Sequence, residues 1–150
     1  MNPTALADQL TAAARDARRH LDTIAAAGHG TVHPTTDPTG WLVGQILRTV
    51  AALTSPTARA CRHVTAAPRV LHAAVWAPGI VVCPACVRHL APAPGEDNRC
   101  DRCRRTVAQL HPSTVALGPL LIGYGLCRRC QHTAGLAPPG ERVEGRRQPR

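Results

Sequence analysis

Bulky apolar side chains are scarce in this chain. Its 150 residues include no Phe, one Met, one Tyr and two Trp, so much of the 44% hydrophobic fraction is Ala and Val. Such a composition gives little material for a deep core, and small weak cores usually need cross-links of another kind. At this length there is room for one ordinary domain, or for a small domain with appendages. The seven cysteines are the obvious candidates for the cross-links.

Lysine is missing altogether, and all 18 basic residues are Arg. Together with abundant Ala, Pro and Thr, this is typical of a GC-rich genome, so part of the Arg excess is a codon effect. That effect weakens any argument from the basic composition alone. A net charge of +9 still favours acidic partners such as nucleic acid.

Long apolar runs are missing as well. The longest run without formal charge, 106–127, is interrupted by Gln109, His111 and Pro112, so we expect no membrane span. The first ten residues, MNPTALADQL, contain no apolar segment typical of a signal peptide. We therefore expect a cytoplasmic protein with reduced thiols. In that compartment, paired cysteines indicate metal or redox chemistry rather than structural disulfides.

Residues 1–55 predict an α-helical hairpin. A helix is expected over 4–27, with Thr4 as its cap and apolar residues recurring at three- and four-residue intervals. Asp37-Pro38 offers an N-cap and a first-turn proline for a second helix, which carries an apolar stripe that includes Trp41. These narrow stripes must bury against each other, the rest of the chain or a second copy. The hairpin is therefore a candidate surface for a protein partner or for self-association.

Residues 56–135 form the cysteine-rich part. We expect a short helix over 68–77, a strand over 80–82, and two strands over 106–110 and 115–122 that turn at HPST. After this part, 136–150 has almost no large apolar side chain and predicts a disordered basic tail. The predicted fold class is a small zinc-stabilised α+β protein, with a helical hairpin followed by a two-zinc module that contains a β-hairpin.

Six of the seven cysteines form C-x-x-C pairs, which are Cys83/Cys86, Cys100/Cys103 and Cys127/Cys130. Between the second and third pairs lie 23 residues with a hairpin pattern, which would bring the two pairs together. Tetrahedral Zn²⁺ needs four thiolate or imidazole ligands, and each C-x-x-C supplies two from one tight turn. The spacing therefore predicts a four-cysteine zinc site.

The order of a cysteine turn, a hairpin and a second pair near a helix start resembles the treble-clef and zinc-knuckle groups of zinc fingers. This resemblance covers only residues 98–135 and implies a structural zinc ion. The sequence departs from the pattern after the last pair, because RRCQHTAGLAPP leaves at most about two helical turns before Gly and Pro stop the helix.

The remaining cysteine, Cys61, suggests a second zinc site with Cys83 and Cys86. A closed structural site needs a fourth ligand, and His63 is our first choice because C-x-H then pairs with C-x-x-C. His89 and His72 are the alternatives. A further possibility is that Cys61 is an ordinary small buried residue and His63 a surface one. With His63, the seven cysteines complete two four-ligand sites and predict two zinc ions.

Six arginines crowd the turns of the four-cysteine site: Arg99, Arg102, Arg104, Arg105, Arg128 and Arg129. They could contact phosphates, helped by the arginines of the tail. Alternatively they offset thiolate charge, because two such zinc sites would lower the net charge from +9 to about +6. The sequence leaves both interpretations open.

The favoured function is that of a non-enzymatic zinc-binding protein that contacts nucleic acid through these arginines, or a regulator. The alternative is a protein-interaction adaptor that uses the helical hairpin, with zinc purely structural. A thiol- or zinc-dependent enzyme comes third. IVVCPAC resembles the strand-to-C-P-x-C entry of glutaredoxin-like enzymes, but no βαβ frame follows it. Zinc catalysis would also need a general acid or base, and only nine carboxylates are present. Iron–sulfur binding by some of the thiolates remains open too.

Overall fold

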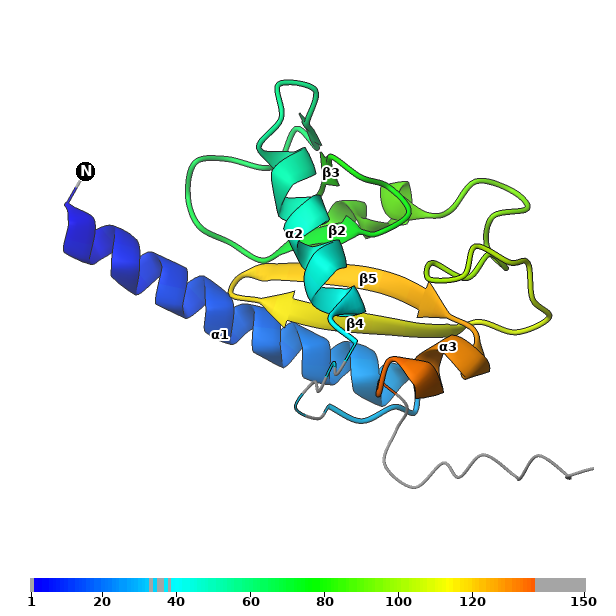
Figure 1. Ribbon diagram of the computed structural model, residues 1–150. Coiled ribbons are helices and arrows are strands. Elements are labelled where there is room, and N and C mark those ends of the chain that lie inside the picture. Colours follow the sequence, from blue (N-terminus) through cyan, green and yellow to red (C-terminus); the bar gives the residue numbers. More distant parts are fainter. Residues whose placement is uncertain (1, 33, 35–36, 38, 137–150) are drawn as a thin grey trace, which may run out of the picture.

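The computed structural model describes residues 2–32, 34, 37 and 39–136, so the predicted tail lies outside the described residues except for Leu136. Figure 1 shows a small α+β protein, which confirms the predicted class. The helical elements are α1 (Pro3–Ala27), α2 (Trp41–Leu53), the 3₁₀ helix η1 (Pro84–Leu90) and α3 (Arg128–Thr133). The strands are β1 (Arg59–Ala60), β2 (Leu71–Ala74), β3 (Ile80–Val81), β4 (His111–Leu117) and β5 (Leu120–Leu126).

Both predicted N-terminal helices are confirmed, with small changes at their starts. Asn2, not Thr4, caps α1, since its Oδ1 accepts the N–H of Thr4 at 3.0 Å. At α2 the N-cap is Gly40 rather than the predicted Asp37, but the Asp37 side chain still caps the helix from further out, because its Oδ2 accepts the N–H of Leu42 at 2.6 Å. Each cap satisfies amide groups that have no partner inside the helix.

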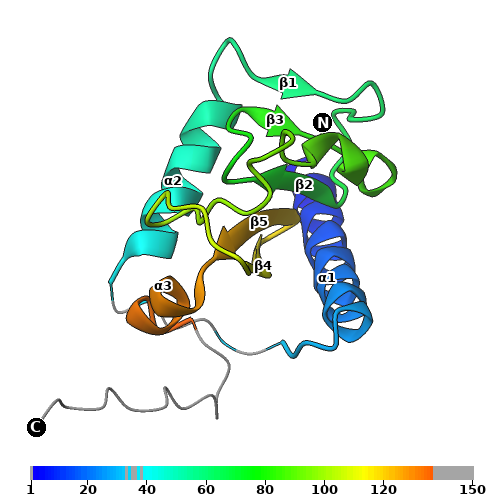
Figure 2. The ribbon, with the colours of Figure 1, turned by 90° about the vertical axis from the view of Figure 1, so that its right-hand side faces the viewer.

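The two helices do not form the predicted hairpin. Figure 2 shows them on either side of the strands β2, β4 and β5. Helix α1 contacts β4 and β5, and α2 inserts Leu42 into a cluster with Tyr124. The physical reason is that the β4–β5 hairpin offers each helix an apolar surface of its own. The only buried residues of α1 are Ala13 and Ala17, so this helix approaches the sheet closely with little bulk.

The predicted β-hairpin exists, but it is shifted along the chain. β4 and β5 are antiparallel, and the turn between them lies at Gly118-Pro119 rather than at HPST, which begins β4. Gly118 has a φ of 55°, a left-handed conformation that glycine adopts without strain. Pro112 is tolerated within β4 because this strand lies at the edge of the sheet, whose order is β2-β5-β4.

The predicted helix over 68–77 is wrong, because the structure places the strand β2 there. β2 pairs in parallel with β5, with Leu71 opposite Leu120. His72, Ala73 and Ala74 are all buried, so the segment is buried on both faces, and such a short run does not distinguish strand from helix by its periodicity. The strand predicted over 80–82 is confirmed as β3, which pairs in parallel with β1.

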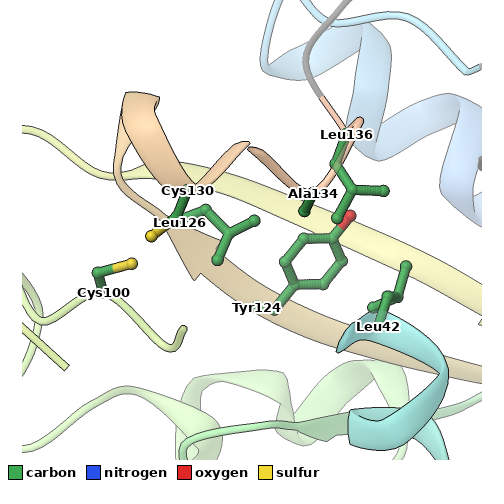
Figure 3. Packing of buried hydrophobic residues seen from close by; sticks show 7 residues of the cluster. All are labelled: Leu42, Cys100, Tyr124, Leu126, Cys130, Ala134 and Leu136. Carbon is green, nitrogen blue, oxygen red and sulfur yellow. The ribbon is translucent and has the colours of Figure 1, made fainter. Parts of the chain in front are cut away.

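The core includes two clusters of buried residues that contain cysteines. One cluster joins Leu42 of α2 to Tyr124 and Leu126 of β5, and it includes Cys100 and Cys130 (Figure 3). The other cluster comprises Ala74, Val82, Cys83, Cys86 and Leu90. Part of the scarce apolar material therefore packs around the sulfur atoms, as the composition leads one to expect of a cross-linked core, whereas Leu121 and Ile122 of β5 are buried outside these two clusters.

Candidate metal centres

The first centre consists of Cys61, His63, Cys83 and Cys86, whose ligand atoms all lie within 4.8 Å of one another. Because β1 and β3 are parallel, Cys61, directly after β1, and Cys83, two residues after β3, leave the ladder at the same end. Cys86 comes from the first turn of η1. His63 completes the group, with its Nδ1 3.2 Å from Cys86 Sγ and 3.8 Å from Cys83 Sγ.

The other two histidines considered for this centre do not join it. His89 lies on η1 outside the group of four and lines a neighbouring cleft. His72 is buried on β2, where its ring makes an edge-to-face contact with His20 at a centroid distance of 5.1 Å. Burial, together with repulsion from His20, lowers the pKa of His72 from 6.5 to about 4. This histidine is therefore a neutral core residue at pH 7.

The second centre consists of Cys100, Cys103, Cys127 and Cys130, which again lie within 4.8 Å of one another. Cys100 and Cys103 come from a tight turn that is closed by the N–H of Arg104 donating to the carbonyl of Cys100 at 2.8 Å. The β4–β5 hairpin then returns the chain to α3, where Cys127 is the residue before the helix and Cys130 lies in its first turn. The Sγ atoms of Cys103 and Cys127 are 4.0 Å apart.

Asp101 ties the turn of the second centre to the sheet. Its N–H donates to the carbonyl of Gly125 at 2.9 Å, and its Oδ2 accepts the N–H of Gly125 at 2.6 Å. Burial raises the pKa of this carboxyl group, against the opposing effect of the Gly125 bond. A Cβ at Gly125 would approach Leu110 to 3.2 Å, so the close pairing also favours glycine there. Asp101 thus serves the architecture of the turn.

The dimensions of both groups fit zinc. A tetrahedron with Zn–S distances of about 2.3 Å has S···S edges of about 3.8 Å, close to the 4.0 Å between the sulfur atoms of Cys103 and Cys127. With a Zn–N distance of about 2.0 Å the N···S edges shorten to about 3.5 Å, which lies between the 3.2 Å and 3.8 Å separations of His63 Nδ1 from Cys86 and Cys83 Sγ. Backbone amides also prepare the sulfur atoms, as the N–H of Cys83 donates to Cys61 Sγ and the N–H of Cys127 donates to Cys100 Sγ, both at 3.3 Å. These are the donors expected around zinc-bound thiolates.

The pKa values of the thiols reflect these backbone N–H donors. The amide of Cys83 is the main cause that lowers the pKa of Cys61 to about 6. Burial raises the pKa of Cys100, but amide donors outweigh it and bring the value to about 7. Burial raises the pKa of Cys86 and Cys130, so these thiols need a cation to hold them as thiolates. The two four-ligand groups are consistent with two zinc ions.

The six arginines predicted to contact phosphate have different surroundings. Arg99 forms an ion pair with Glu96 at 3.0 Å, and Arg102 donates to the carbonyl of Cys130 at 3.4 Å. Arg104 lies 3.8 Å from Asp101. The side chains of Arg105, Arg128 and Arg129 are exposed.

A seventh arginine joins the second centre from α2. Arg48, Arg102 and Arg104 line a cleft of about 380 Å³, together with Trp41 and Asp101. The sequence interpretation missed Arg48. Its signal was available, because Arg48 is the only charged residue in the helix WLVGQILRTVAAL, but only the docking of α2 shows which surface it reaches.

Comparisons with family models, with curated proteins and with solved structures found no match to this chain. Among the described residues, none of the helices has the length and apolar character needed to cross a membrane. What identifies the chemistry is therefore the pair of Cys/His groups, whose donor sets are those of zinc-binding modules.

Proposed function

We propose that this protein is a non-enzymatic zinc-binding protein that contacts nucleic acid through the arginine-rich face of its second centre. The observation that supports this most directly is the cleft of Arg48, Arg102 and Arg104. These three arginines, from α2 and from the cysteine turn, line a volume of about 380 Å³ and outnumber the one carboxylate there, that of Asp101. An excess of arginine suits phosphate oxygens, whereas the half-buried Trp41 at the same cleft packs edge-to-face on Tyr124.

The conformation of Arg104 supports a role for its side chain. Arg104 has a φ of 59°, in the left-handed region where a residue other than glycine costs roughly 1–2 kcal/mol. Its side chain is 49% exposed, and its partner Asp101 already accepts the Gly125 amide. An arginine at a position that glycine would fill with less strain is a reason to look for a function of the charge.

The mode of contact follows from the short helix. The cysteine turn, the β4–β5 hairpin and α3 occur in the order that resembles treble-clef zinc fingers, and we retain that resemblance as part of the proposal. Helix α3 spans only Arg128–Thr133, which is short for a recognition helix in a groove. The proposed contacts are therefore to phosphates, which position a protein on nucleic acid without reading its sequence.

A specific observation favours the adaptor as the second candidate. Val43, Leu47 and Val50 of α2 are 53%, 64% and 36% exposed, although they recur at helical spacing. They form a stripe on the face of α2 that does not enter the Leu42 cluster. An exposed apolar stripe of this kind suits a protein partner or a second copy of the chain.

The test measures nucleic-acid binding by fluorescence polarisation at several salt concentrations. A short labelled DNA duplex and its single strand serve as probes. The triple variant Arg48→Gln/Arg102→Gln/Arg104→Gln should bind more weakly, and each lost phosphate contact should reduce the log–log salt slope by about 0.9 for the duplex. The matched control is Arg15→Gln/Arg18→Gln/Arg19→Gln, which removes the same charge from the exposed side of α1. Both variants should retain two zinc ions.

A single substitution separates charge from strain. Arg104→Gly should relieve the left-handed conformation and raise stability, yet it should still weaken binding. Equal effects of the two triple variants, or no salt-dependent binding at all, would contradict the proposal. In that case the double variant Val43→Ser/Leu47→Ser tests the adaptor role: size-exclusion chromatography measures whether the variant loses an association with a second copy that the wild type shows.

A further inference from the structure

A second cleft, of about 550 Å³, opens beside the first metal centre. Its floor is apolar and contains Ala60, Ile80 and Val82, which come from β1 and from the segment of β3. Its rim also includes the metal-centre residues Cys61 and His63. Residues of β1, β3 and η1 all line it, so the cleft lies between the small β1–β3 sheet and η1.

The rim of this cleft is strongly cationic. Arg59, Arg62 and Arg88 line it, together with His89, and no carboxylate lines it among the described residues. Within that part of the chain, none of the three arginines forms an ion pair with a carboxylate. Arg62 Nε donates a hydrogen bond to Nε2 of the His63 ring, at 3.3 Å. Three thiolates around zinc would carry about −1, so positive charge remains in excess.

The backbone of β1 offers a further recognition element. The N–H groups of Arg59 and Cys61 donate to Gly79 and Val81 on the β3 side, at 2.7 Å and 3.1 Å. Since successive residues of a strand direct their amide groups to opposite sides, the N–H and C=O of Ala60 face the other way. The sheet order is β1-β3, and Figure 2 shows β1 at the outer edge of the molecule. An exposed strand edge accepts another extended chain.

We propose that this cleft binds an extended acidic peptide of a partner protein. The peptide main chain pairs with Ala60 at the β1 edge, an aliphatic side chain lies against the exposed methyl group of Ala60, and flanking carboxylates meet the arginines of the rim. This goes beyond the proposed function, because it assigns a protein ligand to a surface at the other metal centre. A peptide fits better than nucleic acid, since the floor is apolar and no Trp or Tyr lines the described part of the cleft for base stacking.

The test uses a fluorescein-labelled peptide of alternating Glu and Val residues with the full-length, zinc-loaded protein. Arg59→Gln/Arg88→Gln should weaken its binding about tenfold, whereas Arg15→Gln/Arg18→Gln on α1 should change it less than about twofold. Neither double variant touches a metal ligand or Arg62, so zinc content should stay at two. A peptide of alternating Glu and Ser, which lacks the aliphatic side chains, should bind more weakly than the Glu–Val peptide.

A second variant addresses the strand edge. Ala60→Pro removes the outward N–H, and in a variant that retains two zinc ions it should also weaken the Glu–Val peptide. Equal binding of the Glu–Val peptide by wild type and by Arg59→Gln/Arg88→Gln overturns the proposal. It is also overturned if that variant loses affinity for a labelled oligonucleotide but not for the peptide. Binding of DNA through Arg48, Arg102 and Arg104 is a separate measurement, so either proposal can fail alone.

Discussion

The two metal centres have similar ligands but very different surroundings. The first is supported by a parallel ladder of two residues a strand, β1–β3, and by the 3₁₀ helix η1. The second is supported by the seven-residue strands β4 and β5, and its cysteines share a cluster with Leu42 of α2 and Tyr124. Ladders as short as β1–β3 are not stable alone in water.

This difference indicates that the structure around the first centre depends mainly on its zinc ion, whereas the structure around the second has other support. Around the first centre, little besides the zinc would hold residues 59–64 against η1. Around the second, the ion adds to a sheet and to two helices that pack on it (Figure 1). Loss of the first ion should therefore be a local event, and loss of the second should affect the whole molecule.

The largest expected effect is the loss of the second ion. Cys100→Ser should remove it and unfold the chain, because a structural zinc site contributes roughly 10–16 kcal/mol and a typical domain is stable by only about 5–15 kcal/mol. Cys83→Ser should remove one ion while the β4–β5 sheet stays protected. Elemental analysis and hydrogen exchange measure both. If Cys83→Ser unfolds the entire chain, the two regions form one cooperative unit and the comparison fails.

A smaller effect is expected from the histidine of the first centre. His63→Ala should lower the zinc content from two ions toward one and expose 59–64 to proteolysis, because three thiols leave the tetrahedron incomplete. His89→Ala, on the same rim, is the control and should retain both ions. The opposite result for the two variants would assign the fourth ligand to His89.

The smallest effect concerns His72, which joins the two regions. Its N–H donates to Val82 at 2.8 Å, and β2 pairs with β5. Because the folded-state pKa, about 4, lies below the ordinary value of 6.5, the stability it contributes is present above 6.5 and is lost as pH falls toward 4. When the pH falls from about 7 to about 5.5, the free energy of unfolding of the wild type should decrease by about 1 kcal/mol more than that of His72→Leu.

Urea midpoints at the two pH values measure this difference. Proton-driven loss of zinc affects wild type and His72→Leu alike, so the comparison of the two isolates the histidine. Parallel pH profiles would show that His72 does not couple folding to protonation.

The metal-binding groups were accessible from sequence, whereas the sheet was not. The C-x-x-C spacing fixes which residues share a turn, and ligand counting then assigns Cys61 to the pair Cys83/Cys86. The count did not choose among His63, His89 and His72, and it is the fold that places His63 in the group. The register of β4 and β5 depends on which turn closes the hairpin, and Gly118 competes successfully with the polar HPST segment. The hydrophobic pattern did not show whether the hairpin turns at HPST or at Gly118-Pro119, since short apolar runs flank both segments.

β2 and the position of the helices were hidden for another reason. The segment that contains β2 is rich in Ala, which favours helix, and only its parallel partner β5 makes it a strand. The docking of α1 and α2 likewise depends on a sheet with two apolar surfaces. That sheet is assembled from segments far apart in the sequence, so local sequence patterns do not reveal it. Long-range pairing overrode local preference in both cases.

The parallel pairing of β2 with β5 also sets an order of events during synthesis of the chain. Residues 71–74 leave the ribosome well before 120–126, so β2 has no sheet to join while the intervening segment is being made. The ligands of the first centre end at Cys86 and can gather earlier. A zinc ion captured there would hold the nascent chain beside β2 in a compact form until β5 emerges to pair with it.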